Sequence, residues 1–405
     1  MSLRILIVVD LPWDIRLGAC RVLTELTDQW RALGHSVELF SFTEAFPGAR
    51  ATRWLFALQK ASFPRKAAAF IRAHSERFDI IDAIIGSLPY SAAELNFNGL
   101  VVARSIGLYR AYDRFERSVE QRWPHPRRGT VIGRLFYGFA RHLSWRASER
   151  AVHKAGLLNV PNEEEAVCLR EEAGVTNRIL VQPYGLTTEY RKDLSASASP
   201  CVQRLGEERV CFIGMWSPRK GAYDWARIIS RLRELVPTVR FRFLGIMTDS
   251  AALRRDLGSS LDDIELIPDY QPSELPGLLA DCTVGAFPSY AEGFGLAVLD
   301  QLAAGLPTVA YDVAGPRDIL ARHLPSLLIQ KGEVEAFAIA LSDILRAPVA
   351  EYEKISQTCQ AIASEFSWDE IAQTTLRTYQ LALVEKVARR DDTPARGRMS
   401  FKVAL

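Results

Sequence analysis

Two carboxylates and a run of glycines stand together in the segment SYAEGFGLAVLDQLAAGLP, which covers Ser289–Pro307. Glu292 comes directly before Gly-Phe-Gly, and Asp300 follows it eight residues later. An ionised carboxylate only accepts hydrogen bonds, so each acid could hold a pair of ligand hydroxyl groups. The spacing alone fits an exposed helix acid equally well. Because the segment lies between two apolar runs and contains glycines, we interpret it as a polyol-binding site.

The second acid falls on a short predicted helix, Leu296–Ala304, which Gly305 ends. No Ser, Thr, Asp or Asn precedes this helix, so the free N–H groups of its first turn have no built-in side-chain acceptor. An anion would satisfy them, and the helix dipole favours one. Gly293 and Gly295 would let the backbone come close to such a ligand.

Helix geometry places Asp300 on a face of small residues. It projects about 40° from Leu296, and its neighbours there are Ala297, Ala303 and Ala304. A carboxylate in such surroundings needs a hydrogen-bonding partner in the space that the alanines leave. We expect ligand hydroxyl groups to be that partner.

A second group of polar residues lies in FIGMWSPRKGAYDW, Phe212–Trp225. An apolar strand is expected to end at Gly214, and the loop that follows carries Arg219 and Lys220. Two cations at the carboxyl end of a strand can neutralise a diphosphate. A solvated basic turn would have the same sequence, so this interpretation depends on the acidic segment.

Other kinds of chemistry find little support. The first loop, Asp10–Val22, lacks the G-x-G-x-x-G fingerprint of dinucleotide sites. Its Gly18 could approach a substrate, although a packing role is the simpler interpretation. The histidines show no ligand spacing and the cysteines form no C-x-x-C pair, so we expect neither a metal nor another cofactor.

Strands must position these segments, and the chain supplies twelve short apolar candidates. Most are rich in Val and Ile and apolar on both faces, which suits parallel strands covered by helices on both sides. Ligands of such sheets sit beyond the carboxyl ends of the strands. The candidates are Leu3–Val9, Val37–Phe42, Asp79–Ile85, Leu100–Ala103, Gly156–Val160, Ile179–Gln182, Arg209–Ile213, Val239–Leu244, Ile264–Ile267, Thr283–Phe287, Thr308–Tyr311 and Ser326–Ile329.

The candidates form two groups, so we predict two Rossmann-like, doubly wound α/β domains that face each other across a cleft. The small-residue segment SASASP, Ser195–Pro200, is typical of a linker. We place the N-terminal domain at residues 1–195 and the C-terminal domain at residues 205–365. The polar, basic residues 386–405 are expected to form a disordered tail.

Whole-chain properties narrow the class of protein. The 405 residues exceed one ordinary core, and 48% hydrophobic residues with 24% charged is a globular composition. A net charge of +2 gives no argument for nucleic acid. The first apolar run is too short for a signal peptide, no run is long enough to span a membrane, and the scattered cysteines suit a reducing compartment. We therefore expect a cytoplasmic protein.

Residues 104–154 depart from this balance, since they hold twelve Lys or Arg against four Asp or Glu, with aromatic residues between them. The segment Arg53–Arg72 is a similar mixture. Solvated helices with buried aromatic rings are the simpler interpretation. The alternative is a surface that docks on anionic lipid, or on a lipid-linked or anionic acceptor, at the inner face of a membrane.

The acidic segment and its surroundings resemble a known family. PSYAEGFGLAVLDQLAAGLPTVAYDVAGPRDIL, Pro288–Leu320, closely resembles the signature of the retaining glycosyltransferases of family 4 (glycosyl transferases group 1), which have the GT-B fold. RALGHSVELF and FSWDEIAQTTLRTY, Phe366–Tyr379, follow the order that the family shows. The resemblance covers residues 3 to about 385, and it implies a last helix, at about 366–385, that packs back onto the N-terminal domain.

The resemblance implies an enzyme of the EC 2.4 class, a hexosyltransferase type. It would move a sugar from a nucleotide-sugar donor, such as a UDP- or GDP-sugar, with retention of configuration and without a metal. The C-terminal domain would bind the donor, and the N-terminal domain would hold a glycan, lipid-linked or other small-molecule acceptor.

The family's signature also implies roles for single residues. Glu292 would hold donor-sugar hydroxyls, Asp300 would take the ribose hydroxyls, and Lys220 would stabilise the leaving diphosphate. Glu292 and Lys220 are thus the catalytic candidates. The other donor-side candidates are Gly214, Arg219 and the amides of Gly293, Phe294, Gly295 and Leu296.

Three positions depart from the family's pattern. Asp300 stands where the family usually has Glu, which shortens its reach by one methylene. Met215 stands where the family usually has Arg, which removes a phosphate cation that Arg219 could replace. Ile106 stands where relatives often carry His. At the same strand end, Arg104 could contact the acceptor or the donor.

These departures keep several hypotheses open. The leading one is an active transferase in polysaccharide or glycolipid assembly. A nucleotide-sugar-binding subunit without transferase activity is the alternative, because Met215 and Ile106 stand at unusual positions. A GT-B enzyme with other chemistry, an epimerase or a phosphorylase, is the third. One fold serves many donors, so the sequence names neither the sugar nor the base nor the acceptor.

Overall fold

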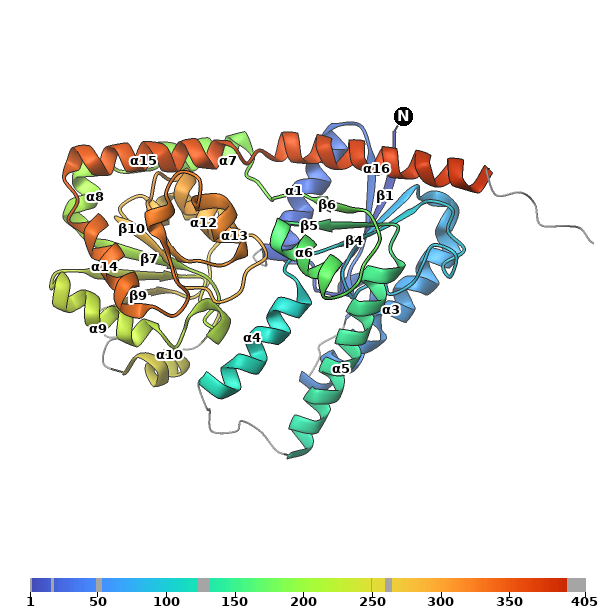
Figure 1. The fold of residues 1–405 in the computed structure, drawn as a ribbon, viewed down its shortest axis with the longest axis horizontal. Helices are drawn as coiled ribbons and strands as arrows, with labels where there is room; N and C mark the ends of the chain where they lie inside the picture. The colour runs from blue at the N-terminus through green and yellow to red at the C-terminus, as the bar shows by residue number, and fades with distance from the viewer. Residues whose placement is uncertain are drawn as a thin grey trace, which may run out of the picture.

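The structure, a computed structural model, describes residues 2–15, 18–48, 53–122, 131–248, 250–258 and 264–391. Within these ranges the chain forms two six-stranded sheets, which confirms the predicted α/β fold (Figure 1). The strand order is β2-β1-β3-β4-β5-β6 in the first sheet and β12-β11-β10-β7-β8-β9 in the second. All of these neighbours pair in parallel.

Each of the twelve predicted strands is present, with ends that differ from the prediction by at most two residues. The strands of the first sheet are β1 (Arg4–Val8), β2 (Ser36–Phe40), β3 (Ile80–Ile84), β4 (Leu100–Arg104), β5 (Leu157–Val160) and β6 (Ile179–Val181). Those of the second are β7 (Arg209–Ile213), β8 (Arg240–Leu244), β9 (Ile264–Ile267), β10 (Val284–Phe287), β11 (Thr308–Tyr311) and β12 (Leu328–Ile329).

Helices cover both faces of the sheets. They are α1 (Gly18–Ala32), α2 (Phe42–Ala45), α3 (Arg53–His74), α4 (Tyr109–Arg122), α5 (Val131–Lys154), α6 (Glu163–Glu171), α7 (Thr188–Ala196), α8 (Cys201–Glu207), α9 (Trp225–Leu235), α10 (Ser250–Leu257), α11 (Leu275–Leu279), α12 (Leu296–Ala303), α13 (Ala314–Leu320), α14 (Val334–Leu345), α15 (Val349–Ser364) and α16 (Trp368–Asp391). No helix among the described residues combines the length and the apolar character that crossing a membrane requires.

The strands are buried because helices pack on both of their faces. Every residue of β3, IIDAI, is buried, and so is every residue of β10, VGAF. Large rings fill the helix–sheet layers, with Trp30 on α1 and Trp225 on α9 fully buried. The carboxyl ends of the strands are thereby left as the edges where loops can form a site.

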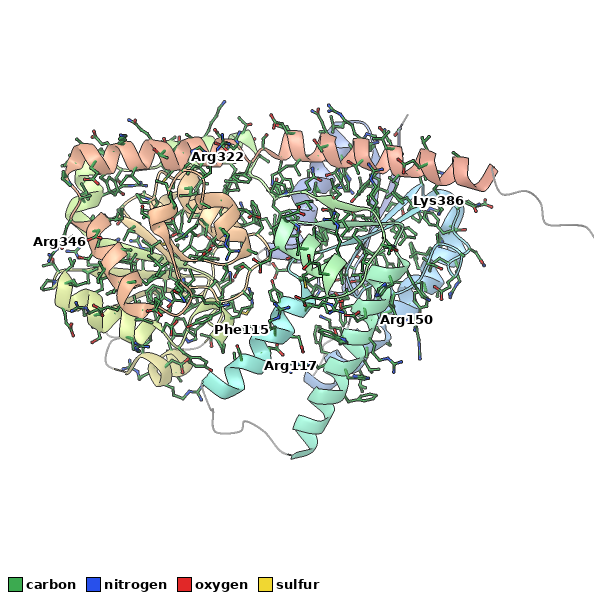
Figure 2. All side chains as sticks on the ribbon, in the orientation of Figure 1. Phe115, Arg117, Arg150, Arg322, Arg346 and Lys386 are labelled. Carbon is green, nitrogen blue, oxygen red and sulfur yellow. The ribbon has the colours of Figure 1, made fainter. Side chains whose placement is uncertain are left out.

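Helix α16 follows α15 along one side of the molecule and lies against the first sheet (Figure 1). The indole Nε1 of Trp30 donates to the Ala372 carbonyl at 3.3 Å, and the Tyr379 hydroxyl donates to Asp82 at 2.6 Å. Lys386, near the end of α16 in Figure 2, donates to the Gly99 carbonyl.

The first six residues of the expected tail, 386–391, belong to α16. The helix α16 continues to Asp391, because Lys386 is anchored on the first sheet by its bond to Gly99. The remainder of the expected tail, residues 392–405, lies outside the described residues.

Candidate active site

The basic loop leaves the end of β7 and turns through a short 3₁₀ segment, Pro218–Lys220. Gly214 has φ of +151°, a conformation that side chains rarely adopt, and a methyl group there would lie 3.6 Å from the Lys220 side chain. Gly221 packs so tightly that a methyl group would meet the Pro288 carbonyl at 2.3 Å. The two glycines therefore bring the basic loop against the segment that leads to Glu292.

Three predicted site residues meet at the end of this loop. Lys220 Nζ lies 2.6 Å from Oε1 of Glu292, and Arg219 Nη1 donates to the same oxygen at 2.9 Å. Arg219 also donates to the Ala291 carbonyl at 2.8 Å. The Glu292 side chain is 8% exposed. We call Arg219, Lys220 and Glu292 the cation–carboxylate cluster.

The electrostatics of this cluster follow from burial and charge. Burial raises the pKa of Glu292, but the charges of Lys220 and Arg219 outweigh it and hold that pKa below its ordinary value. Burial lowers the pKa of Lys220, with a further contribution from Arg219, and the attraction of Glu292 does not fully offset this. The cluster is a largely buried group of charges at the carboxyl ends of β7 and β10.

The glycine loop that follows Glu292 leads into α12. Gly295 is the N-cap of α12 with φ of +93°, and no side chain caps the helix start. The side chain of Phe294 is 3% exposed and packs between Tyr184 and Phe366. Phe294 therefore anchors the loop, and only its backbone is placed to meet a ligand.

The first domain sits directly on this glycine loop. A methyl group on Gly293 would lie 2.8 Å from the Cα atom of Gly107, which follows β4. Asn162 Nδ2 donates to the Gly293 carbonyl at 2.5 Å. On the same side, the guanidinium of Arg219 lies 4.8 Å from the centre of the Tyr112 ring on α4.

Asp300 has a protein partner where we expected ligand hydroxyl groups. Arg21, on the first turn of α1, donates from Nη1 to Oδ2 at 2.8 Å and from Nη2 to Oδ1 at 2.9 Å. The side chains are 14% and 3% exposed, and the guanidinium lies 4.9 Å from the centre of the Tyr190 ring. The space left by the alanines of α12 is thus filled by a cation from the other domain.

The remaining candidates have different surroundings. Arg104 is 2% exposed, with Nε bonded to Asp82 and Nη2 to both Asp82 and the Tyr379 hydroxyl. The charge of Arg104 is thereby paired within the first domain, where it holds α16 on the first sheet, and its contact with the acceptor or donor stays a prediction. Gly18 begins α1 with open space around it, and Met215 is 47% exposed.

Sequence reasoning missed four residues of this region: Arg21, Tyr112, Asn162 and Glu165. Two of them, Asn162 and Glu165, could have been found from a helix-capping pattern in the sequence. Asn162 precedes three glutamates, as an N-cap does, and its side-chain oxygen accepts from the Glu165 N–H. Arg21 gave no such signal, because an arginine on a helix that covers a sheet is ordinary.

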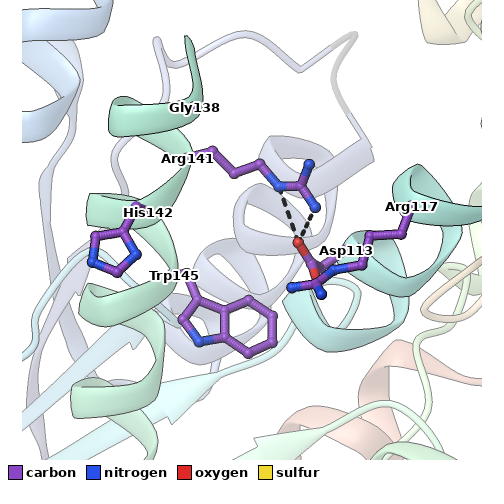
Figure 3. Close-up of a pocket in the computed structure, with 6 residues that line it drawn as sticks. All are labelled: Asp113, Arg117, Gly138, Arg141, His142 and Trp145. Carbon is purple, nitrogen blue, oxygen red and sulfur yellow. Dashed lines mark hydrogen bonds and ion pairs between the residues drawn. The ribbon is translucent and has the colours of Figure 1, made fainter. Parts of the chain in front are cut away.

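A separate pocket of about 510 Å³ lies between α4 and α5. Figure 3 shows Asp113 of α4 facing Arg141 of α5 across it. Arg117, His142 and Trp145 also line it. None of its lining residues belongs to the cation–carboxylate cluster or to the glycine loop. Among the described residues, no three His, Cys, Asp or Glu side chains gather as a metal site would require.

Residues 207–347 match a family described as "Glycosyl transferases group 1". A D-inositol 3-phosphate glycosyltransferase of Mycobacterium avium is 32% identical over 194 residues, which is 46% of this chain and 45% of that protein. A glycogen synthase of Mycobacterium tuberculosis is 25% identical over 204 residues, 48% of each chain. The chain thus spans about half the length of the curated relatives it matches.

Solved structures extend the likeness to nearly the whole chain. Sucrose-phosphate synthase from Thermosynechococcus elongatus has a TM-score of 0.74 at 17% identity, covering 94% of this chain and 100% of its own. Anabaena HepE in complex with UDP and glucose has a TM-score of 0.65 at 16% identity, covering 94% and 100%. At such identities the likeness establishes the fold, which is GT-B.

Proposed function

We propose that the protein is an active retaining glycosyltransferase, because residues 207–347 match the group 1 glycosyl transferases and the chain has the GT-B fold. It would move a sugar from a UDP- or GDP-sugar to a glycan, a lipid-linked or another small acceptor. The cation–carboxylate cluster is the observation that carries this proposal, because it sets two cations and one acid beside an uncapped helix start.

In the proposed reaction Lys220 faces the diphosphate of the donor. Negative charge develops on that group as the glycosidic bond to it breaks, and a buried cation stabilises this charge more strongly than an exposed one. Lys220 is 14% exposed, and its partner in the structure is Glu292. Glu292 would exchange part of this contact for hydroxyl groups of the transferred sugar.

The glycine loop and α12 complete the donor side of the proposal. The amides of Gly293–Leu296 lie at a helix start without a side-chain cap, where a phosphate is favoured. Asp300 would take the ribose hydroxyls in exchange for part of its contact with Arg21. The HepE structures are in complex with UDP and with UDP-glucose, and a starch synthase structure is bound to ADP and acarbose. Those ligands support a nucleoside diphosphate in the corresponding cleft of this chain.

The proposed division of the chain follows the fold. Residues 1–195 with α16 would serve the acceptor, with Gly18 at the cleft, and residues 205–365 would serve the donor. A binding subunit without activity is the second candidate. It is favoured by Met215, which is exposed at the position of the usual Arg, and by Arg219, whose charge is already engaged with Glu292.

Slow hydrolysis of a panel of UDP- and GDP-sugars decides between the two. We expect turnover by the wild type and its loss in Lys220→Ala and Glu292→Ala, both of which should still unfold in one cooperative thermal transition, Glu292→Ala at a lower temperature. Arg231→Ala, which removes an exposed ion pair with Glu335, serves as the control. If the wild type is inert while a thermal-shift screen finds a stabilising nucleotide, the binding-subunit proposal replaces the transferase.

We also propose that the first domain docks on an anionic membrane. The docking surface is smaller than the whole basic segment 104–154. Many of the cations there are paired within the protein: Arg110 with Glu149, Arg114 with Glu172, Arg117 and Arg141 with Asp113, and Lys154 with Glu94. The exposed face of α5 remains, where Phe139, Leu143, Arg146 and Arg150 follow at helical spacing.

Flotation with anionic liposomes tests this surface. Binding of the wild type should fall as salt rises, and Arg150→Glu should bind less than the wild type. Arg322→Glu makes the same change of charge on the other domain and should bind normally (both positions are labelled in Figure 2). Absence of wild-type binding at low salt would remove the proposal.

A further inference from the structure

Glu165 is a buried acid at the interface of the two domains, and the proposed reaction gives it no role. It lies in the first turn of α6 and is 4% exposed. Its Oε1 accepts from the Leu108 N–H at 3.1 Å, and its Oε2 has no hydrogen-bond partner among the described residues. A buried carboxyl that is only partly satisfied is costly, so its position calls for a reason.

The carboxyl group holds the loop that faces the donor side. Leu108 follows Gly107, and Gly107 is the residue whose Cα lies 2.8 Å from where a methyl group on Gly293 would be. The Gly107 N–H in turn donates to the hydroxyl of Ser105 at 3.2 Å. Glu165 therefore fixes the backbone of Ser105–Leu108 at the point where the first domain touches the glycine loop.

The N-cap of the same helix touches the glycine loop directly. Asn162 accepts from the Glu165 N–H through Oδ1 at 2.8 Å and donates through Nδ2 to the Gly293 carbonyl at 2.5 Å. Asn162 is 1% exposed. The first turn of α6 thus holds both sides of the contact between Gly107 and Gly293.

The charge state of Glu165 is sensitive to pH near neutrality. Burial raises its pKa to about 7, although Ser105, the Leu108 N–H and Asn162 favour the charged form. The folded protein therefore binds a proton here between about pH 4.3 and pH 7, where the unfolded chain does not. Stability falls as the pH rises through that window, so above it the carboxylate is kept at a cost in stability.

Other titratable groups surround Glu165 and have to be separated from it. Tyr112 on α4 and Tyr184 after β6 lie near it, as does Glu164 on its own helix. Helix α13 packs on α6 and carries Arg317, paired with Glu164, and Asp318, whose pKa burial raises to about 6. Asp318 is therefore the neighbour whose titration falls closest to that of Glu165.

We propose that Glu165 is a positioning residue for the transfer reaction: its carboxylate holds the Ser105–Leu108 loop against Gly293 and so fixes the first domain over the donor's glycine loop. The active form is the carboxylate, because its oxygens only accept hydrogen bonds, as the Leu108 N–H requires, whereas the protonated form gives up part of this capacity. The inference rests on the proposed function.

The test compares the wild type, Glu165→Gln, Glu164→Gln and Asp318→Asn in donor hydrolysis between about pH 5.5 and 8.5. The wild type should lose activity below a step near pH 7. Glu165→Gln should be about tenfold slower at the upper end and lack the step. It should also melt a few degrees higher there, because no carboxylate remains to be buried. Glu164→Gln and Asp318→Asn should keep the step.

Hydrogen exchange of the Leu108 amide gives a readout that needs no turnover. Glu165→Gln should speed this exchange about fivefold at the upper pH, as expected for a weakened hydrogen bond. A step that persists in Glu165→Gln, or that vanishes in Asp318→Asn, overturns the proposal. Unchanged exchange overturns it as well. If the protein shows no turnover but the exchange responds, the transferase proposal fails and the positioning of the loop stands.

Discussion

Two buried carboxylates lie where the two domains meet, and their cations come from different places. Glu292 is paired with Arg219 and Lys220, which belong to its own domain. Asp300 is paired with Arg21, which belongs to the other domain. Both acids lie within one segment and are almost inaccessible, yet one is held by its own sheet and the other by the opposite half of the molecule.

This difference determines whether each ion pair depends on contact between the two domains. The cation–carboxylate cluster joins two loops of one sheet, so it can persist when the domains separate. The pair of Arg21 and Asp300 exists only while the domains are closed. Burial lowers the pKa of Arg21, but the charge of Asp300 more than offsets this, and the net shift is upward. Arg21 therefore stays charged, and this contact couples the proposed ribose site to domain closure.

Among the variants that test this comparison, Glu292→Gln should cause the largest losses of activity and stability. It leaves Arg219 and Lys220 buried without their shared acid, so we expect about a 100-fold loss of donor hydrolysis and about 3 kcal/mol less stability in chemical denaturation. The domains should remain closed, because the interdomain pair is untouched. Small-angle scattering should find an unchanged radius of gyration.

The pH dependence of the Glu292→Gln effect checks its electrostatic cause. The folded pKa of Glu292 is below its ordinary value, so its ion pairs stabilise the protein above about pH 4.3, and this stability is lost as the pH falls through the folded pKa. The gap in unfolding free energy between wild type and variant should therefore shrink below about pH 4. A gap that is independent of pH would contradict the assignment.

Arg21→Met should have the next largest effect on stability. Unlike Glu292→Gln, it should also change the radius of gyration. It leaves Asp300 buried without a partner, and we expect a loss of about 2 to 3 kcal/mol in unfolding free energy. Because the lost contact joins the domains, the radius of gyration should increase. Arg21→Met combined with Asp300→Asn should recover part of the stability. If Arg21→Met stayed compact while Glu292→Gln opened, the comparison between the two acids would be wrong.

The fold could be predicted because its signals are local. Short Val- and Ile-rich segments recur between helices, and burial on both faces makes each strand readable by itself. The meeting of Lys220 with Glu292 could be expected too, since both follow neighbouring strands, β7 and β10, whose carboxyl ends share an edge. In these cases local pattern and sheet topology are sufficient.

Contacts between the domains could not be predicted in this way. Arg21 and Asp300 are 279 positions apart, and no periodicity relates the start of α1 to the face of α12. The partner of Arg104 could not be predicted for a related reason. Its partner Asp82 lies 22 positions earlier inside the apolar strand IIDAI, where a buried acid already requires a cation.

Removal of the exposed ion pair between Arg317 and Glu164, which also joins the two domains, should have the smallest effect on stability. Arg317 of α13 lies 2.8 Å from Glu164 of α6, with side chains 43% and 60% exposed. Glu164→Gln breaks a contact between the domains as Arg21→Met does, but both partners remain in water. We expect less than about 0.5 kcal/mol in unfolding free energy and no change in the radius of gyration. A larger loss would mean that the number of contacts across the cleft, rather than the burial of Asp300, controls closure.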